Sequence, residues 1–573
     1  MAQDGRGNFA LVLHAHLPYV LMHGTWPHGT DWLNEAAGEC YIPLINAFWD
    51  LAEEGISANV TLNVTPVLAD QLADEVFQDA FLDYLAHRIE FAEQNEREFH
   101  DTGRPHLESL AAMWREYFEG IHRDFTERYQ KDLIGALRRL QDAGHIEIIT
   151  CCATHGYLPL LGRDACVAAQ VRAGAAAYRR HFGREPQGIW LPECAYRPRY
   201  PWSSPLEEEA EAEERMGVEE VLHEAGIRYF FVDSHLLKGG KPVGVYLERF
   251  EALQRLWGQF SDAYTPRPEI AERSPHRAYL VAADPGAERA AAAFVRDPVS
   301  ALQVWSGEHG YPGDSWYLDF HKKHYPGGHR YWRVTDPKAD LGEKLHYEPQ
   351  RVEERLESHA WHFADLVRDI LAGDQRVGAG EGIVCAPFDA ELFGHWWFEG
   401  PRWLHKVLRR IANDEAVRAV TCSRYLADHP PAGVVSLPEG SWGEGGFHWI
   451  WLNEWTEWTW RDIHECEEKL LALLDRHRGD GDGLLQRLLR QAGRELLLLE
   501  SSDWQFLIST WHARDYAENR LSVHYADFAR LAELAERYAQ ARSLSGEEQR
   551  FLELLEARDN VFPDLDLGAW ACG

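Results

Sequence analysis

The sequence predicts an α/β fold, a distorted seven-stranded (β/α) barrel with a helical insertion and a C-terminal all-helical domain. Short apolar runs rich in β-branched or aromatic residues alternate with helical patterns, which favours a parallel sheet, and their number favours a barrel. Polar or aromatic residues follow the runs, as expected at the carboxyl-terminal mouth of a parallel barrel. The runs are Phe9–Leu13, Val60–Val64, Ile146–Thr150, Gly188–Leu191, Arg228–Val232, Leu302–Trp305 and Gly382–Pro387.

Four segments complete this organisation. Residues 1–400 hold the predicted strands, and within them residues 76–139 are charged and helical in pattern, which predicts a helical insertion. Residues 201–220 include the acidic stretch SSPLEEEAEAEERMG, which we expect to be a solvated loop without chemistry. In residues 401–573 the strand runs fade and leucines recur at helical spacing, which predicts a helical domain packed on the barrel.

The composition narrows the choice of partners and compartment. The 573 residues include 58 Lys and Arg against 92 Asp and Glu, a formal net charge of −34, so nucleic acid and anionic membrane surfaces are poor partners. The nine cysteines are scattered, and the N-terminus lacks the apolar core of a signal peptide. No apolar run approaches the ~18 residues of a membrane span. We expect a cytoplasmic monomer.

Two histidines lie two positions apart on the first predicted strand. His14 and His16 leave the same face of that strand, because successive side chains alternate. The pair is compatible with a zinc site, with hydrogen bonds to substrate hydroxyls, or with a structural role inside the barrel, since two ligands do not specify a metal. Other strand ends offer further imidazoles for a metal: His155, His235, His309 and His395.

Carboxylates follow two predicted strands that are far apart in the chain. Glu193 stands in GIWLPECAYRP among apolar residues, where an idle carboxylate would be costly. Asp389 and Glu391 stand in APFDAELFGHWW, and their spacing alone does not choose between them. Two carboxylates at one barrel mouth, without a Ser or Cys nucleophile motif or a phosphate-binding glycine loop, indicate glycosidic chemistry.

Tryptophans indicate the kind of ligand. The chain holds 23 of them, and FHWIWLNEWTEWTW places five beside Asn and Glu. The apolar face of a sugar ring stacks on indole, while its hydroxyls bond to amides and carboxylates. We therefore expect five partly exposed platforms for sugar rings, at Trp449, Trp451, Trp455, Trp458 and Trp460.

Six stretches, in order and at compatible spacing, resemble the successive motifs of glycoside hydrolase family 57, most closely its members that branch α-1,4-glucans. They are LHAHLPYV, NVTPVLADQL, THGY, GIWLPECAYRP, DAELFGHWW and WLNEWTEWTW, and SSDWQF lies in the expected helical domain. The likeness extends over nearly the whole chain. It implies a retaining double displacement on a seven-stranded barrel, with no metal and no cofactor, and a C-terminal domain that contributes to a glucan-binding cleft.

The resemblance also implies roles for single residues. Glu193 is the expected nucleophile, Asp389 the expected proton donor, and Glu391 a carboxylate that orients its neighbours. Tyr246, in GGKPVGVY, matches the tip of a mobile loop that covers the site. His512 departs from the family, because the branching members place a glutamine there. The expected substrate-binding residues are His14, His16, Trp26, His155, Tyr246, Arg296, Trp305, Gly313, His395, Trp396, Trp451, Trp460, Asp503 and His512.

The expected activity is cleavage of an α-1,4 glucosidic bond and transfer of the glucan chain to a 6-hydroxyl, which forms α-1,6 branches in glycogen. An α-amylase or a 4-α-glucanotransferase of the same family is the alternative within this fold. Two further alternatives belong to other classes, a non-catalytic glucan-binding protein and a metal-dependent hydrolase. The presence of both Glu193 and Asp389 argues against the non-catalytic protein.

Overall fold

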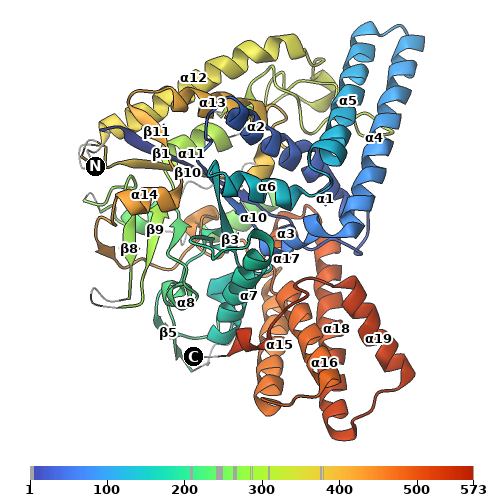
Figure 1. Cartoon of the computed structure of the whole chain (residues 1–573), viewed down its shortest axis with the longest axis vertical. Helices are drawn as coiled ribbons and strands as arrows, with labels where there is room; N and C mark the ends of the chain where they lie inside the picture. Colours follow the sequence, from blue (N-terminus) through green and yellow to red (C-terminus); the bar gives the residue numbers. More distant parts are fainter. Residues whose placement is uncertain are drawn as a thin grey trace.

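Parallel strands in a closed ring organise the first two thirds of the molecule (Figure 1). The computed structural model describes residues 5–206, 211–240, 250–261, 267–270, 272–283, 286, 288–306, 310–374, 377–378 and 380–571. Within them, the ring runs β10-β1-β2-β3-β4, then β7 and β9, and back to β10, with isolated parallel bridges closing two gaps. This ring confirms the predicted barrel. Its strands are β1 (Gly7–Ala15), β2 (Val60–Val64), β3 (Ile146–Cys151), β4 (Ile189–Trp190), β7 (Tyr229–Val232), β9 (Ala291–Val295) and β10 (Ile383–Asp389).

One predicted strand was wrong. Leu302–Trp305 lies in helix α11 (Pro298–Trp305), and the strand that completes the ring is β9, ten residues upstream. Asp297 caps α11, since its carboxylate accepts from the backbone N–H of Ser300 at 2.6 Å, and a proline occupies the first turn. A short apolar run is compatible with either a buried strand or a buried helix, and here the cap and the proline decide for the helix.

Helices surround the ring, and two of them extend away from it. In Figure 1, α4 (Glu75–Asp101) and α5 (Pro105–Arg123) form a long hairpin that projects from the barrel, within the segment predicted to be a helical insertion. The other helices of this part are α1 (Thr30–Ala36), α2 (Ile42–Glu53), α3 (Pro66–Ala73), α6 (Leu133–Asp142), α7 (Asp164–Phe182), α8 (Val218–Glu224), α9 (Ser234–Lys238), α10 (Glu251–Phe260), α12 (Pro349–Gly373), α13 (Gly400–Ala412) and α14 (Cys422–Asp428).

Short additional strands pair with members of the ring. β11 (Val417–Ala419) pairs with β1, while β8 (Tyr279–Val281) and β12 (Val434–Val435) extend the sheet beside β9. β5 (Tyr200–Trp202) and β6 (Glu213–Arg215) form an antiparallel pair within the acidic segment. Residues just after 400 thus still contact the barrel, and the domain division at residue 400 stays a prediction.

The C-terminal part is helical, as the leucine spacing predicted, and forms a bundle at one end of the molecule (Figure 1). The predicted apolar positions of α16, among them Leu485, Leu488 and Leu496, are buried. A bridge between Gly156 and Ser501 joins the segment after β3 to the start of α17. None of the described helices is long and apolar enough to cross a membrane. The helices are α15 (Glu457–Arg476), α16 (Gly483–Leu499), α17 (Asp503–Thr510), α18 (Arg514–Ala541) and α19 (Gly546–Arg558).

Candidate active site

The expected nucleophile, Glu193, lies where the chain leaves β4. Its backbone is left-handed, with φ of 59°, a conformation that is uncommon for residues other than glycine and concentrates at functional sites. The indole N–H of Trp442 donates to Glu193 Oε2 at 2.8 Å. Burial raises the pKa of the Glu193 carboxyl to about 8, the Trp442 hydrogen bond opposes the rise, and the nearby Asp389 adds to it. The site thus holds a desolvated carboxylate with one oxygen oriented by an indole.

The expected proton donor, Asp389, ends strand β10. It is paired in register with His14 of the neighbouring strand β1, so it lies at the same end of the ring as that histidine. The charge of Asp389 raises the pKa of Glu193 and also that of Glu391. The three carboxyl groups therefore lie close enough to influence one another's protonation.

Glu391 is held by two donors. Its Oε1 accepts from the Tyr41 hydroxyl at 2.6 Å and from the backbone N–H of His16 at 3.0 Å. Burial raises the pKa of Glu391 to about 8, the Tyr41 hydrogen bond opposes the rise, and Asp389 adds to it. These contacts tie the end of β1 to the segment after β10, which agrees with the predicted orienting role.

The hydrogen bonds of His14 and His155 determine which ring nitrogens carry protons. Asn63 donates its amide hydrogens to the carbonyls of Ile149 and Thr150, so its Oδ1 accepts from His14 Nδ1 at 2.6 Å. Burial lowers the pKa of both histidines well below the ordinary value, which keeps both rings neutral. His14 Nε2 then accepts from His155 Nε2 at 3.1 Å.

The series of hydrogen bonds continues from His155 to Ser502, in the C-terminal part of the protein. Because His155 is neutral and protonated on Nε2, its Nδ1 accepts from the Ser502 hydroxyl at 2.8 Å. All four ring nitrogens of His14 and His155 are thus engaged by protein groups. Both side chains are buried, and the His14 ring stacks on Trp190 at 4.7 Å. A sugar hydroxyl would have to displace one of these hydrogen bonds to reach a ring nitrogen, and the substrate-binding role of both histidines stays a prediction.

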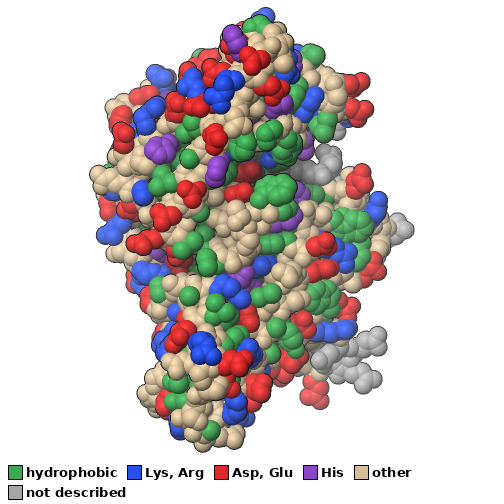
Figure 2. Space-filling model, turned by 90° about the vertical axis from the view of Figure 1, so that its right-hand side faces the viewer, with side chains coloured by type: hydrophobic (Ala, Val, Ile, Leu, Met, Phe, Trp, Pro, Cys, Tyr) green, Lys and Arg blue, Asp and Glu red, His purple; other side chains and the backbone are tan. Residues whose placement is uncertain are grey.

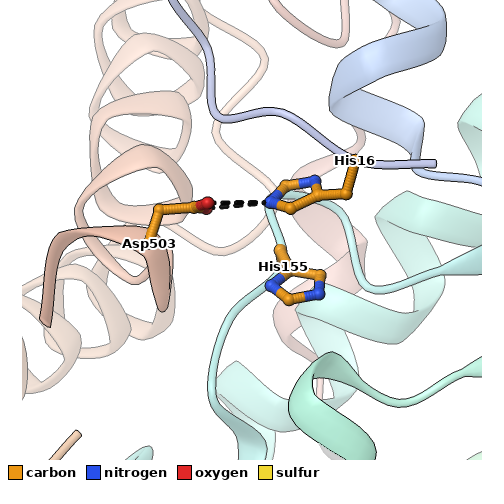
Figure 3. Close-up of side chains that lie close together, drawn as sticks. All are labelled: His16, His155 and Asp503. Atoms are coloured by element: carbon orange, nitrogen blue, oxygen red, sulfur yellow. Dashed lines mark hydrogen bonds and ion pairs between the residues drawn. The ribbon is translucent and has the colours of Figure 1, made fainter. Parts of the chain in front are cut away.

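His16 and Asp503 join the barrel to the helical domain at the mouth (Figure 3). His16 Nε2 lies 2.9 Å from Asp503 Oδ2, and its ring stacks on that of His155 with centroids 4.0 Å apart. The side chains of His16 and Asp503 keep 8% and 16% of their surface exposed. Asp503 is the first residue of α17, where a carboxylate is favoured by the helix dipole. This pair brings the SSDW stretch next to the end of β1, and a glucan contact of Asp503 stays a prediction.

Other predicted binding residues lie in the segments that follow β9 and β10. Nearby opposite charges lower the pKa of Glu39 to about 2 despite its burial, so Glu39 accepts a hydrogen bond from His395 Nδ1 at 3.1 Å. The Trp396 ring lies 6.4 Å from that of the buried Trp305. Gly313 ends the one-turn segment η5 (Tyr311–Gly313).

Arg296, another predicted binding residue, follows β9 and is buried. It pairs with Asp233 at 3.4 Å, and its guanidinium carbon lies 5.4 Å from the centroid of the Trp442 ring. Its Nε and Nη2 have no hydrogen-bond partner among the described residues. Buried donors of this kind call for an acceptor, such as water or a sugar hydroxyl. Arg296 therefore has donors to offer beside the indole that orients Glu193.

The tryptophan prediction was wrong for two of the five residues. Trp451 and Trp460 are each only 1% exposed, and the Trp460 indole N–H donates to the carbonyl of Trp451. Trp451 stacks on Tyr157 at 4.5 Å, so these two rings are core and not open platforms. Trp449, Trp455 and Trp458 are half-buried, as predicted.

The remaining predicted residues differ in how far they can be placed. Trp26 is 75% exposed in the loop between β1 and α1. His512 is exposed after α17, and its ring lies 6.2 Å from that of Phe250. Tyr246 and His309 lie outside the described residues.

Four residues of the site were missed by the sequence reasoning: Tyr41, Asn63, Trp442 and Ser502. Asn63 lies in a quoted motif at the end of a predicted strand, and Ser502 precedes the predicted Asp503, so their positions were available signals. Trp442 lies in the glycine-rich stretch GSWGEGG, which predicts only a loop. Tyr41 belongs to the π-helical turn η1 (Ala37–Tyr41), a feature that often marks functional sites but has no sequence pattern here.

Comparison with known proteins agrees with this geometry. Residues 10–297 match the profile of Glycosyl hydrolase family 57, and the chain belongs to that family. Residues 462–570 match the profile described as 1,4-alpha-glucan branching enzyme, C-terminal. The chain is 42% identical to a 1,4-alpha-glucan branching enzyme of Thermococcus kodakarensis, over 99% of this chain and 78% of that protein.

Solved structures give the same picture. A GH57-type branching enzyme from Pyrococcus horikoshii superposes with a TM-score of 0.87 at 39% identity, covering 99% of this chain and 97% of that one. An α-amylase from Thermotoga maritima superposes with a TM-score of 0.79 at 28% identity, covering 99% of both chains. Similarity to the branching enzymes is therefore the greater of the two, and it extends through the helical domain.

Proposed function

We propose that this chain is a 1,4-α-glucan branching enzyme, which cleaves an α-1,4 glucosidic bond and transfers the glucan chain to a 6-hydroxyl to form α-1,6 branches in glycogen. The observation that carries the proposal is the pairing of His16 with Asp503 beside the carboxylates Glu193 and Asp389. Through this pair, the part of the chain that matches a branching-enzyme domain borders the barrel mouth.

In the first half-reaction, Glu193 attacks the anomeric carbon of the donor glucan. Trp442 holds Oε2 of this carboxylate, while Oε1 accepts no hydrogen bond from the described residues and is the attacking oxygen. Asp389 donates its proton to the oxygen of the departing chain. The bond from C1 to the glycosidic oxygen breaks as the bond from C1 to Oε1 forms.

In the second half-reaction, a 6-hydroxyl of an acceptor chain attacks C1 and releases Glu193. Asp389, now ionised, takes the proton of that hydroxyl, which restores both carboxyl groups. Attack by water at the same step would give hydrolysis, so the site must exclude water to branch. For a retaining pair we expect the carboxyl groups of Glu193 and Asp389 to lie about 5 to 5.5 Å apart in a glucan complex.

Iodine staining of amylose separates this activity from the alternatives. A branching enzyme lowers the absorbance with few new reducing ends, and a debranching enzyme then releases short chains from the product. An α-amylase would instead raise the reducing ends in step with the loss of colour. A 4-α-glucanotransferase would yield no chains that the debranching enzyme can release.

Water exclusion provides a second test, at a residue that the structure does not describe. If Tyr246 covers the site, as the sequence predicts, Tyr246→Ala should raise hydrolysis relative to branching. The ratio of new reducing ends to new branches measures it. An unchanged ratio would remove this role from Tyr246.

Metal-dependent hydrolysis is the alternative of another class. Ligand atoms of His16, His155 and Asp503 lie within 4.8 Å of one another, which is compatible with an ion. The hydrogen bonds to both nitrogens of His155 compete with such a ligand role. Activity that survives a strong chelator supports the metal-free mechanism, and activity lost to the chelator and restored by Zn²⁺ would replace it.

We further propose that the enzyme works as a cytoplasmic monomer. The cysteine pattern supports the compartment, because the eight described cysteines are buried and unpaired, as in reducing compartments. Light scattering with size-exclusion chromatography measures the mass, which should be that of one 65.7 kDa chain. Fractionation of the source cells tests the location.

A further inference from the structure

Exposed aromatic side chains extend from the barrel mouth onto the C-terminal helices. Trp26 is 75% exposed and Trp511, which follows α17, is 44% exposed. His512 is exposed beside Trp511, and Trp455 is half-buried. We refer to Trp26, Trp455, Trp511 and His512 as the aromatic strip. Figure 2 shows a face of the molecule on which exposed hydrophobic side chains lie next to histidines around a hollow.

Contacts join the segments that carry the strip. The loop between β1 and α1 packs on the start of α18, since the His28 ring lies 5.8 Å from that of Tyr516 and the Tyr516 hydroxyl donates to the His23 carbonyl at 3.3 Å. On the other side, the Trp455 and Trp511 rings lie 5.2 Å apart at an angle of 47°. The loop that carries Trp26 therefore packs on the start of α18, and Trp455 packs on Trp511 at the end of α17.

The backbone of Trp511 is the first sign that its indole has a function. Trp511 caps the C-terminus of α17 with φ of 57°, a left-handed position that favours glycine or asparagine. A bulky aromatic residue is strained there, and nearly half of its surface remains in water. The backbone at this position does not favour an aromatic residue, and strain of this kind concentrates at ligand contacts.

Polar groups beside the ring pair complete the features of a sugar site. The guanidinium of Arg255 lies 5.4 Å from the centroid of the Trp511 ring. The Gln259 amide donates to Glu454 Oε1 at 3.2 Å, and both side chains are exposed. Sugar rings need an apolar face to stack on and donors and acceptors at its edge, and this corner offers both.

We propose that Trp455 and Trp511 form an additional binding subsite for an α-1,4-glucan chain, outside the barrel mouth. The inference rests on the proposed function, which supplies the ligand. Asp503 pairs with His16 at the mouth and begins α17, while Trp511 follows its last turn, about 12 Å away along the helix axis at ~1.5 Å per residue. A chain held at the mouth needs only a few further sugar units to reach the ring pair.

The substitution Trp511→Gly tests the subsite without damaging the fold, because glycine is favoured at this backbone position. Electrophoresis of the full chain in gels that contain amylopectin measures the dissociation constant. We expect Trp511→Gly to raise it about fivefold or more while the melting temperature stays equal or rises. Trp361→Ala is the matched control, since Trp361 is 53% exposed on α12, away from the strip, and should leave the constant unchanged.

Two results would overturn the proposal: Trp511→Gly with the affinity of the wild type, or an equal loss in Trp361→Ala. If Trp511→Gly unfolds, Trp511→Asn, which also accommodates the left-handed backbone, decides the question. It should repeat the loss of affinity at an unchanged melting temperature. If the wild type itself does not branch amylose, the proposed function is wrong, and this result is distinct from a failure of the subsite.

The products show which chain uses the subsite. If it holds the donor, Trp511→Gly alters the lengths of the chains released by debranching. If it holds the acceptor, those lengths stay the same and the KM for the acceptor glucan rises. Either change supports the subsite, whereas unchanged lengths and unchanged KM would oppose it.

Discussion

The loops after β4 and β10 each present a glutamate, half-buried at Glu193 and buried at Glu391, and the two glutamates differ in how they are held. Burial raises the pKa of Glu193 and of Glu391 to about 8, and Asp389 contributes to both shifts. Among the described residues, Trp442 gives Glu193 its one side-chain hydrogen bond, and the backbone of Glu193 is left-handed. Glu391 receives two hydrogen bonds on a single oxygen, from Tyr41 and from the backbone of His16.

This comparison teaches that a perturbed pKa finds the site but does not assign the roles within it. Both carboxyl groups are desolvated beside the same acid, so electrostatics alone does not separate them. The hydrogen bonds from the described residues do separate them, because two donors, Tyr41 and the His16 backbone, hold Glu391, whereas Trp442 alone holds Glu193. Substitutions at the two glutamates and at their donors test that separation.

Isosteric amides at the two glutamates should have very different effects on activity. Glu193→Gln removes the nucleophile and should lower the branching rate by about 10³-fold or more. Glu391→Gln keeps an oxygen acceptor for Tyr41 and for the His16 backbone, so we expect a loss below about 10²-fold. Iodine staining with counting of debranched chains measures both. Equal losses would break the comparison.

The same variants should gain stability at high pH. Both folded pKa values, about 8, lie above the ordinary value of 4.5, so between these values the folded state holds protons that the unfolded state has released. The free energy of unfolding of the wild type should therefore fall as the pH rises from 4.5 to 8. Above pH 8 each amide variant should be more stable than the wild type, by on the order of 2–4 kcal/mol.

Urea unfolding of the wild type and both variants at pH 5 and pH 8.5 measures this difference. The gain should be present at the higher pH and nearly absent at the lower one. A gain of the same size at both pH values would mean that packing, and not the burial of charge, causes it.

Trp442→Phe should act on Glu193 alone. Loss of the indole N–H removes the hydrogen bond that lowers the pKa of this carboxyl, so its pKa should rise. The acid limb of the kcat/KM profile should then move to higher pH, by up to about one unit. A limb that stays in place would show that Trp442 does not act on the nucleophile.

Tyr41→Phe should have the smallest effect on activity. It removes one of the two donors to Glu391, whose pKa should rise, while the His16 backbone still holds the carboxyl. We expect the branching rate at neutral pH to fall less than about tenfold, with a loss of roughly 1–3 kcal/mol in stability. A collapse of activity like that of Glu193→Gln would give Glu391 a direct part in the chemistry.

Much of the barrel and its two main carboxylates could be predicted from the sequence. Glu193 and Asp389 follow predicted strands directly, and the ends of parallel strands meet at one mouth. Leu302–Trp305 shows the limit, since four apolar residues fit a strand or a buried helix equally well. A similar ambiguity affects the tryptophans, because the local sequence does not show which side chains of a turn are buried. Trp451 and Trp460 are core residues.

The partners of the carboxylates could not be predicted, because they are remote in the chain. Trp442 lies 249 residues from Glu193, and Tyr41 lies 350 residues from Glu391. No local pattern couples positions so far apart. Their contacts exist only because the ring of strands closes and the segments between the strands pack over its mouth.

The sequence by itself determined six of the seven strands of the ring, the motifs at the strand ends and the kind of chemistry that two isolated carboxylates allow. These properties depend on residue type and short spacing, which the chain states directly. Only the tertiary structure decided the tautomers of His14 and His155, the hold on Glu391, and which tryptophans remain exposed. Those properties depend on burial and on hydrogen bonds between distant segments, which arise only when the chain folds.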